Sequence, residues 1–254
     1  MVLFADMKKD TTYIFGKNAV AEALQRVPES IDGMWLADYV QDPQLIAYAR
    51  AGNVRVHPLD GKKIEKWIGK DMVHQGIVAS VDTASLTKPY KEFMDSLEVT
   101  PHTSIAILAE LHDPQNVGAV IRSAAAFGVT AVFIPLHNQA PVNGTVVKVS
   151  AGAAFAINLV SIGNVNQAIS DLKEKGFWIY GLDSESKQPL TKEKFEEPSV
   201  FVIGNEGEGL REKTREHCDI LLSIPMSDRV ESLNAASSAA ITFYDWSTKH
   251  RGAL

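Results

Sequence analysis

Apolar residues in the first third of the chain follow helical and strand-like spacings in turn. A helical spacing covers residues 17–27, and another covers 61–68, where Ile64, Trp67 and Ile68 share one face. Short apolar strands are predicted at 33–36, 54–57 and 76–81. Together these elements predict a small α/β domain over residues 1–82.

The next stretch, residues 83–103, contains Pro89, Pro101 and several Ser and Thr residues. It has no sustained period apart from a short helical pattern around 93–97, and it is interpreted as a linker.

From residue 104 onward, solid apolar runs alternate with helical patterns. The runs predict strands at 105–111, 131–134, 177–182, 200–203 and 220–224. Helices are predicted at 118–127, 165–175, 210–218 and 233–246. Uninterrupted apolar strands with helices between them are typical of a mostly parallel sheet that is covered on both faces. The fold class is therefore α/β, with a second domain over residues 104–254.

Composition excludes several classes of protein. No apolar run reaches the length of a membrane-spanning helix, and residues 1–15 lack the apolar core of a signal peptide. Cys218 is the only cysteine, which excludes an intrachain disulfide framework and a cysteine-based zinc site. The seven histidines show no metal-binding spacing. We expect a cytoplasmic protein without a metal.

The net charge of −6 argues against a broad nucleic-acid-binding surface. Residues 1–80 carry ten basic and ten acidic residues, whereas residues 81–254 carry fifteen and twenty-one. Any RNA contact therefore depends on local patches, which the first domain is better placed to supply.

Polar and glycine-rich segments follow three of the predicted strands. They are HDPQNVGAVIRSAAAFG at 112–128, GNEGEGL at 204–210 and PMSDRVESLNAASSAA at 225–240. Because ligands bind beyond the carboxyl ends of parallel strands, all three segments are expected at one edge of the sheet. The sequence therefore predicts a ligand site at that edge.

Individual residues in these segments could have either a structural or a ligand-binding role. Asn116 is expected to cap the helix that follows Asp113-Pro114, and Arg122 is either a ligand-binding residue or a solvated or paired surface arginine. Ser232 is a candidate N-cap of the last helix, whose small residues at 235–240 favour close packing.

The glycines at 204, 207 and 209 have the order G-x-x-G-x-G, which differs from the dinucleotide-binding order. They indicate either a ligand loop or a tight turn before a helix.

As a set, the segments resemble the three signature motifs of the SpoU/TrmH family of SPOUT methyltransferases. GKNAVAEAL at 16–24 and HQGIVA at 74–79 resemble the amino-terminal RNA-binding domain of bacterial 23S rRNA (guanosine-2′-O-)-methyltransferases, which is similar to a ribosomal-protein fold. The resemblance implies a carboxyl-terminal trefoil knot, S-adenosylmethionine as methyl donor, a homodimer, and methylation of a ribose 2′-hydroxyl in 23S rRNA.

The resemblance also implies the site residues. Those implied in catalysis are Arg122, Asn116, Glu206, Ser232 and Asn234. Those implied in cofactor binding are Gly204, Ile224, Leu233, Gly209, Leu182 and Met226. Because arginine stays protonated, Arg122 is expected to bind phosphate or stabilise a developing alkoxide rather than act as a base.

Two positions depart from the family pattern. The loop at 135–141 has no Lys or Arg, and Phe155 stands where Glu is common. Three alternatives stay open: a tRNA 2′-O-methyltransferase of the same family, a nucleotide-dependent oxidoreductase, and a catalytically silent RNA-binding protein. The glycine order counts against the oxidoreductase, and the complete set of motif residues counts against the silent protein.

Overall fold

The computed structural model describes residues 11–205, 207 and 209–254, and the chain divides into two compact units. Unit 1 comprises residues up to 87 together with 142–156, and unit 2 comprises 88–141 and 157–254. The regular elements of unit 1 are β1 (Thr11–Phe15), α1 (Lys17–Arg26), η1 (Pro28–Ser30), β2 (Ile31–Leu36), α2 (Pro43–Ala51), β3 (Val56–Pro58), α3 (Gly61–Ile68), β4 (Ile77–Asp82), η2 (Thr83–Leu86), α6 (Gly144–Val149) and η3 (Ala153–Phe155).

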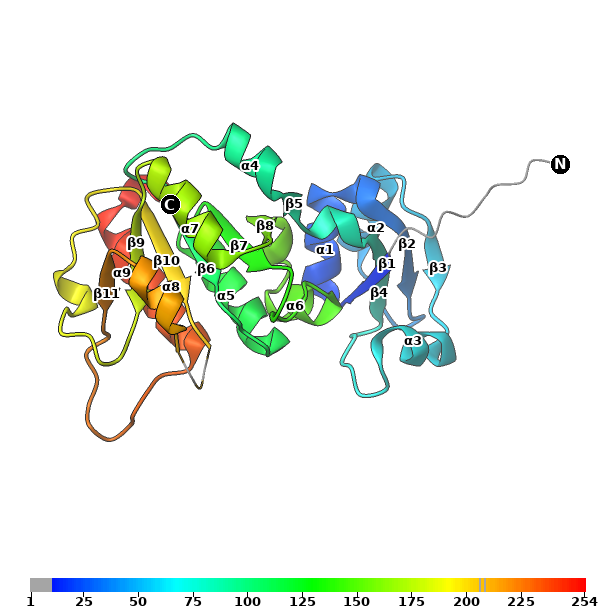
Figure 1. Ribbon diagram of the computed structural model, residues 1–254. Helices are drawn as coiled ribbons and strands as arrows, with labels where there is room; N and C mark the ends of the chain where they lie inside the picture. The colour runs from blue at the N-terminus through cyan, green and yellow to red at the C-terminus, as the bar shows by residue number, and fades with distance from the viewer. Residues whose placement is uncertain (1–10, 206, 208) are drawn as a thin grey trace. The chain divides into compact units, whose positions relative to one another are not determined.

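The strands of unit 1 form a sheet in the order β1-β4-β2-β3 (Figure 1). β4 is antiparallel to both β1 and β2, and β3 is parallel to β2. Ile14, Met34, Ala79 and Val81 project from one face of this sheet and are fully buried. The α/β character predicted for this part of the chain is confirmed, although β1 and α2 were not predicted.

The segment 142–156 belongs to unit 1 although it lies far along the chain. α6 packs against β1 so closely that a Cβ added at Gly144 would lie 2.0 Å from the carbonyl oxygen of Tyr13. Asn143 begins this helix by accepting hydrogen bonds from the backbone N–H groups of Thr145 and Val146. Unit 1 is therefore built from two separate parts of the sequence.

Unit 2 contains the larger sheet. Its regular elements are β5 (Lys88–Pro89), α4 (Tyr90–Ser96), β6 (Ser104–Leu108), α5 (Pro114–Ala126), β7 (Ala131–Pro135), β8 (Asn158–Ile162), α7 (Val165–Glu174), β9 (Trp178–Leu182), η4 (Leu190–Lys192), β10 (Ser199–Ile203), α8 (Glu212–His217), β11 (Ile220–Leu222), α9 (Ala235–Lys249) and η5 (Arg251–Ala253). Within the described residues the sheet has seven strands in the order β11-β9-β10-β6-β7-β8-β5. Every paired strand in it is parallel, as the solid apolar runs predict.

Helices cover both faces of this sheet. On one face, Ile105, Val200 and Val202 pack with buried residues of α4 and α7. On the other face, the ring of Phe201 contacts the rings of Phe243 and Trp246 on α9, which in turn packs against α5. α4 lies in the stretch interpreted as a linker, and its Phe93 and Met94 are buried in this core.

The strand order changes direction between β6 and β10. From β6 the chain adds β7 and β8 on one side, and it then returns to add β9, β10 and β11 on the other. Such a reversal leaves a crevice at the carboxyl ends of the two neighbouring strands. The segments that begin after β6 and β10 are the first and second of the predicted site segments.

The beginning of α5 differs from the prediction. The helix begins at Pro114 rather than at residue 118, because Asp113 caps it by accepting a hydrogen bond of 2.8 Å from the N–H of Gln115. Asn116 therefore lies inside the first turn and is not the cap. Across the described part of the chain, no helix is long and apolar enough to span a membrane.

Candidate functional site

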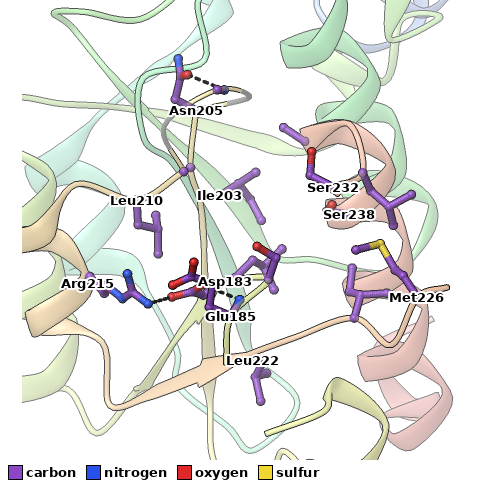
Figure 2. Close-up of a pocket in the computed structure, with 18 residues that line it drawn as sticks. Asp183, Glu185, Ile203, Asn205, Leu210, Arg215, Leu222, Met226, Ser232 and Ser238 are labelled. Atoms are coloured by element: carbon purple, nitrogen blue, oxygen red, sulfur yellow. Dashed lines mark hydrogen bonds and ion pairs between the residues drawn. The ribbon is translucent and has the colours of Figure 1, made fainter. Parts of the chain in front are cut away.

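A cavity of about 400 Å³ opens at the carboxyl ends of β9, β10 and β11 (Figure 2). The segment after β10 contributes mostly glycine backbone, and the segment after β11 contributes apolar side chains. The lining residues are Leu182, Asp183, Ser184, Glu185, Ile203, Gly204, Asn205, Gly207, Gly209, Leu210, Arg215, Leu222, Ile224, Met226, Ser232, Leu233, Ala235 and Ser238. All six residues predicted to bind a cofactor are among them.

The glycine segment forms a tight loop at one wall of the cavity. Asn205 and Gly209 exchange backbone hydrogen bonds of 3.0 Å, and Gly209 has a φ of 68°, which favours glycine. A Cβ added at Gly204 would lie 2.5 Å from the carbonyl carbon of Gly209. The backbone therefore needs a glycine at 204 to form this wall. Glu206, predicted as catalytic, lies outside the described residues.

The third segment is tied to the first by a pair of asparagines. Asn234 Nδ2 donates to Asn116 Oδ1 at 2.9 Å, and these residues are 118 positions apart in the chain. Asn234 also begins α9, because its Oδ1 accepts from the N–H groups of Ala236 and Ser237. The prediction that Ser232 caps this helix is wrong, and Ser232 is an exposed residue of the cavity wall.

The second segment is also tied to the chain just after β6, two residues before the first segment begins. Asn205 Nδ2 donates to the carbonyl oxygen of Glu110 at 2.9 Å, and the Glu110 carboxylate pairs with Arg211 at 2.7 Å. Glu110 has a φ of 67°, so its backbone turns sharply directly after β6. The predicted convergence of the three segments at one sheet edge is thus found.

Arg122 lies on α5 and does not line the cavity. Its side chain is exposed, and among the described residues it has no hydrogen-bond or ion-pair partner. Its five N–H donors are therefore not taken up by any residue that the structure describes. This placement is compatible with contact to a second substrate and excludes Arg122 from the cavity wall.

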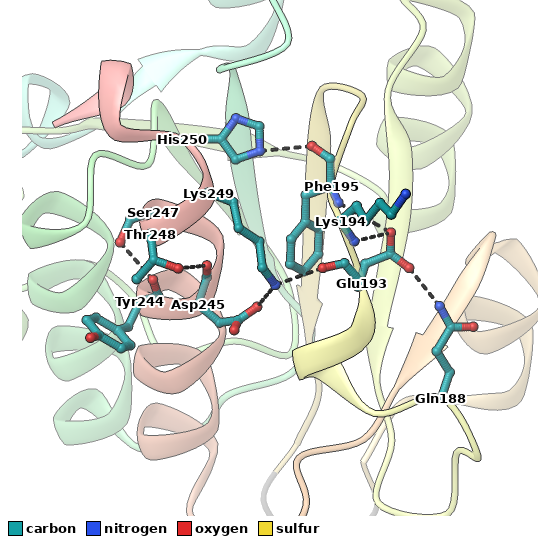
Figure 3. Close-up of polar contacts among 10 residues, drawn as sticks. All are labelled: Gln188, Glu193, Lys194, Phe195, Tyr244, Asp245, Ser247, Thr248, Lys249 and His250. Carbon is teal, nitrogen blue, oxygen red and sulfur yellow. Dashed lines mark hydrogen bonds and ion pairs between the residues drawn. The ribbon is translucent and has the colours of Figure 1, made fainter.

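The carboxyl-terminal end of α9 is fixed by several polar contacts (Figure 3). Lys249 Nζ donates to the carbonyl oxygen of Glu193 at 2.7 Å, and the ring of buried His250 bonds to the carbonyl of Phe195 at 2.8 Å. Together with the Asn116–Asn234 contact, these bonds hold α9 at both ends. Residues at its amino-terminal end, including Ser238 in the cavity, are consequently attached to a fixed element.

Sequence reasoning missed the segment after β9. Asp183 follows this strand directly, lines the cavity and forms an ion pair with Arg215 of α8 (Figure 2). The rule that ligands bind beyond the carboxyl ends of strands also applied to β9, so the signal was present in the sequence.

Cys218 is not a candidate nucleophile. Burial raises the pKa of its thiol to about 12, and Sγ donates to the carbonyl oxygen of Thr214. The reactive thiolate is therefore not formed near neutral pH. The described residues also contain no cluster of His, Cys, Asp and Glu able to hold a metal ion.

Comparison with known protein families shows to which family the chain belongs. Residues 103–244 match the SpoU rRNA Methylase family, and residues 13–87 match a domain described as RNA 2′-O ribose methyltransferase substrate binding. The chain belongs to the SpoU rRNA methylase family. The family match spans all three site segments.

Curated relatives extend over most of the chain. It is 33% identical to the 23S rRNA (guanosine-2′-O-)-methyltransferase RlmB of Pseudomonas putida over 237 residues, which cover 91% of this chain and 94% of that protein. It is 34% identical to RlmB of Xanthomonas campestris over 251 residues, which cover 97% of this chain and all of the relative.

Solved structures of the family share the fold. The SpoU methyltransferase AviRb from Streptomyces viridochromogenes, in complex with AdoMet, has a TM-score of 0.80 at 21% identity, covering 94% of this chain and 90% of AviRb. At this identity the likeness establishes only that the two proteins share a fold.

Proposed function

We propose that this protein transfers a methyl group from S-adenosylmethionine to the ribose 2′-hydroxyl of a guanosine in 23S rRNA. The observation that carries the proposal is the cavity formed by the 204–210 and 224–233 segments, bordered by the contact between Asn116 and Asn234. The relatives named as 23S rRNA (guanosine-2′-O-)-methyltransferases support a guanosine of 23S rRNA as the target.

The cavity fits S-adenosylmethionine in size and chemistry. Its volume of about 400 Å³ falls within the range of small-molecule sites. Leu182, Ile224 and Leu233 supply apolar surface for an adenine ring, and the glycine backbone at 204–209 leaves room for close approach. When bound, this cofactor supplies an electrophilic methyl group on a sulfonium.

Polar residues from all three segments would act on the RNA. A ribose hydroxyl is a weak nucleophile that must lose its proton around the transition state. Arg122 would bind the neighbouring phosphate or stabilise the developing alkoxide, since its guanidinium stays charged. Asn116, Ser232 and Asn234 would orient the hydroxyl by hydrogen bonds, and Glu206 would accept a proton or orient Arg122.

The carboxyl-terminal trefoil knot and the homodimer also belong to this proposal. Tyr244 and Ile241 of α9 are 58% and 39% exposed, and the Tyr244 ring lies 5.7 Å from that of Phe127. Exposed apolar residues gathered on packed helices are typical of an interface, and we assign this surface to the subunit contact. The protein is expected to act in the cytoplasm.

Replacing Arg122 with Ala tests the catalytic assignment. Methyl transfer to 23S rRNA should fall by about 100-fold or more, while the affinity for S-adenosylmethionine measured by calorimetry stays unchanged. Arg251→Ala, at another exposed arginine, is the matched control. Equal activity of Arg122→Ala and wild type would contradict the role of this residue.

Mapping ribose methylation in cellular RNA tests the target. Cells that lack the protein should lose a 2′-O-methyl mark on a guanosine of 23S rRNA. Loss of a mark on tRNA instead, with 23S rRNA unchanged, would assign the protein to the tRNA-modifying members of the family.

A further inference from the structure

One face of the unit 1 sheet carries a group of aromatic rings. The register pairs Tyr13 and Gly33 with Ser80, and Trp35 with Val78 and His57, so these residues project from the same face. Trp67 of α3 joins them from above the sheet. The rings of Tyr13, Trp35, His57 and Trp67 are called the aromatic face below.

The rings lie close together and are ordered by stacking. Tyr13 and Trp67 stack with centroids 4.6 Å apart and planes at 5°, while Trp35 contacts Trp67 at 4.7 Å and His57 at 5.7 Å. Ring spacings in this range are favourable and hold side chains in fixed orientations. The aromatic face is therefore a preformed surface.

Folding of unit 1 does not fully account for this face. The core of the sheet lies on the opposite side, where Ile14, Met34 and Ala79 are completely buried. On the aromatic side, a small buried cluster of Phe15, Ile64 and Val78 has Tyr13 and Trp67 packed against it. Trp35 and Trp67 nevertheless remain half-buried and His57 is exposed, so packing within unit 1 does not fully enclose these residues.

The surroundings of the aromatic face are basic, in contrast to the chain as a whole. Residues 55–74 contain five basic and three acidic residues, although the full chain has a net charge of −6. Arg55 directly precedes β3, and its carbonyl oxygen accepts a hydrogen bond of 2.9 Å from the N–H of Met34 in β2. Lys63 lies one helical turn before Trp67.

These cations are available for a ligand. Arg55, Lys63, Lys66 and Lys70 are exposed, and none forms an ion pair with another residue in the part of the chain that the structure describes. Burial and then the charge of Asp32 raise the pKa of Tyr13. The four cations belong to α3 and to the residues that flank β3 and α3.

We propose that the aromatic face binds unpaired nucleotides of the RNA substrate. A base stacks on Trp35 and His57, and the adjoining phosphates contact Arg55, Lys63 and Lys66. Single-stranded RNA is recognised by this combination of aromatic platforms and flanking cations. The proposal rests on the proposed function, and it assigns the RNA contact to named residues of the segment that matches the substrate-binding domain.

A second copy of the chain or an apolar protein segment fits this surface less well. Neither partner would need both the exposed cations named above and the aromatic rings. A nucleotide supplies a π-face for the rings and a negative charge for the cations. The expected ligand is thus a flexible or looped RNA strand rather than a duplex, whose bases are already stacked.

Binding of a short single-stranded oligouridylate to the full-length protein tests this, measured by fluorescence anisotropy without S-adenosylmethionine. Trp35→Ala and His57→Ala should each weaken binding by about tenfold. Tyr39→Ala is the matched control, because Tyr39 is a 74% exposed aromatic residue of the same unit, and it should leave the affinity unchanged. His57 is exposed, so His57→Ala keeps the test valid if Trp35→Ala fails to fold.

An abasic oligonucleotide of the same length separates stacking from charge. Wild type and His57→Ala should bind it equally, whereas Lys63→Ala combined with Lys66→Ala should weaken its binding severalfold. Unchanged oligouridylate affinity in His57→Ala and in folded Trp35→Ala would overturn the proposal. Self-association of the wild-type protein that is lost in these variants would also overturn it, because the aromatic face would then bind a second copy of the chain.

The affinity for S-adenosylmethionine, measured in parallel, separates this outcome from failure of the proposed function. Unchanged oligouridylate affinity in the variants, with cofactor binding intact in wild type, would count only against the aromatic face. Absence of cofactor binding in wild type would count against the methyltransferase itself.

Discussion

Replacing Gly204 with Ala perturbs the cofactor cavity at a single, well-defined point. The added Cβ would lie 2.5 Å and 2.6 Å from the carbonyl carbon and oxygen of Gly209, and 2.8 Å from the amide nitrogen of Leu210. All three atoms belong to the backbone, so a change of side-chain rotamer cannot relieve the overlap. The loop must shift, although the paired hydrogen bonds between Asn205 and Gly209 hold it in place.

The size of the effect follows from this geometry. Forcing an extra methyl group into a packed site typically costs about 1–3 kcal/mol. If the loop moves away from the position that contacts the cofactor, the same energy appears as a loss of affinity of roughly 5- to 150-fold. Calorimetric titration with S-adenosylmethionine measures this loss, and thermal unfolding measures any accompanying loss of stability.

Gly207→Ala provides the matched control in the same loop. Among the described atoms, the nearest to an added Cβ at Gly207 is Asn205 Oδ1, at an ordinary contact distance of 3.6 Å. Because Gly207 also lines the cavity but its added Cβ meets no backbone atom, this variant should lose less affinity for the cofactor than Gly204→Ala does. Unchanged affinity in Gly204→Ala would refute the reasoning, and so would equal losses in both variants, because the effect would then not depend on the close approach at 204.

Three further predictions concern α9. Asn234→Ser keeps a helix cap but removes the amide that donates to Asn116, so it should lower methyl transfer in wild type and have little further effect in Asn116→Ala, as a double-mutant cycle would show. Burial, then the charges of His102 and Lys249, lower the pKa of His250, so the folded chain favours the neutral ring. Stability should therefore be full above about pH 6.5 and decline as the pH falls through the folded value, and the melting temperatures of His250→Gln should show a weaker pH dependence. Tyr244→Asp should convert the proposed dimer to monomers in sedimentation experiments, whereas Tyr39→Asp should not.

Elements with long apolar runs were predicted well from the sequence. β6, β7, β9 and β10 were all expected within a few residues of their observed bounds, because a buried parallel strand must be apolar on both faces. β8 was missed, since Asn158 and Ser161 interrupt its apolar pattern. This strand is defined by its pairing with β7 and not by its own amino-acid composition.

Helix starts were predicted less well: the start of α2 was overlooked, and at α5 the turn was recognised but the cap was assigned to Asn116. Asp42-Pro43 and Asp113-Pro114 both begin helices by the same chemistry, with an aspartate cap and a proline that needs no hydrogen bond for its nitrogen. The sequence contained this signal at α2 and α5. Asn116 was assigned to capping because an amide can cap a helix locally, whereas its partner Asn234 is distant in the chain.

The position of the site could be predicted, but its internal contacts could not. Strand polarity alone places the three segments at one edge, which requires only the order of strands and helices. The bonds from Asn205 to Glu110 and from Asn234 to Asn116 depend on how the segments fold beyond the strands. Local sequence pattern carries no information about pairs separated by 95 and 118 positions.

The proposed assignments place cofactor binding and RNA recognition on different residues. The cavity is lined by the segments after β9, β10 and β11, whereas Arg122 lies outside it on α5 and the aromatic face belongs to unit 1. Substitutions in the cavity should therefore change the affinity for S-adenosylmethionine without changing that for RNA, and substitutions at Arg122 or Trp35 should do the reverse. Asn116 and Asn234 join the segments on which both groups depend, so their variants alone should affect the two substrates together.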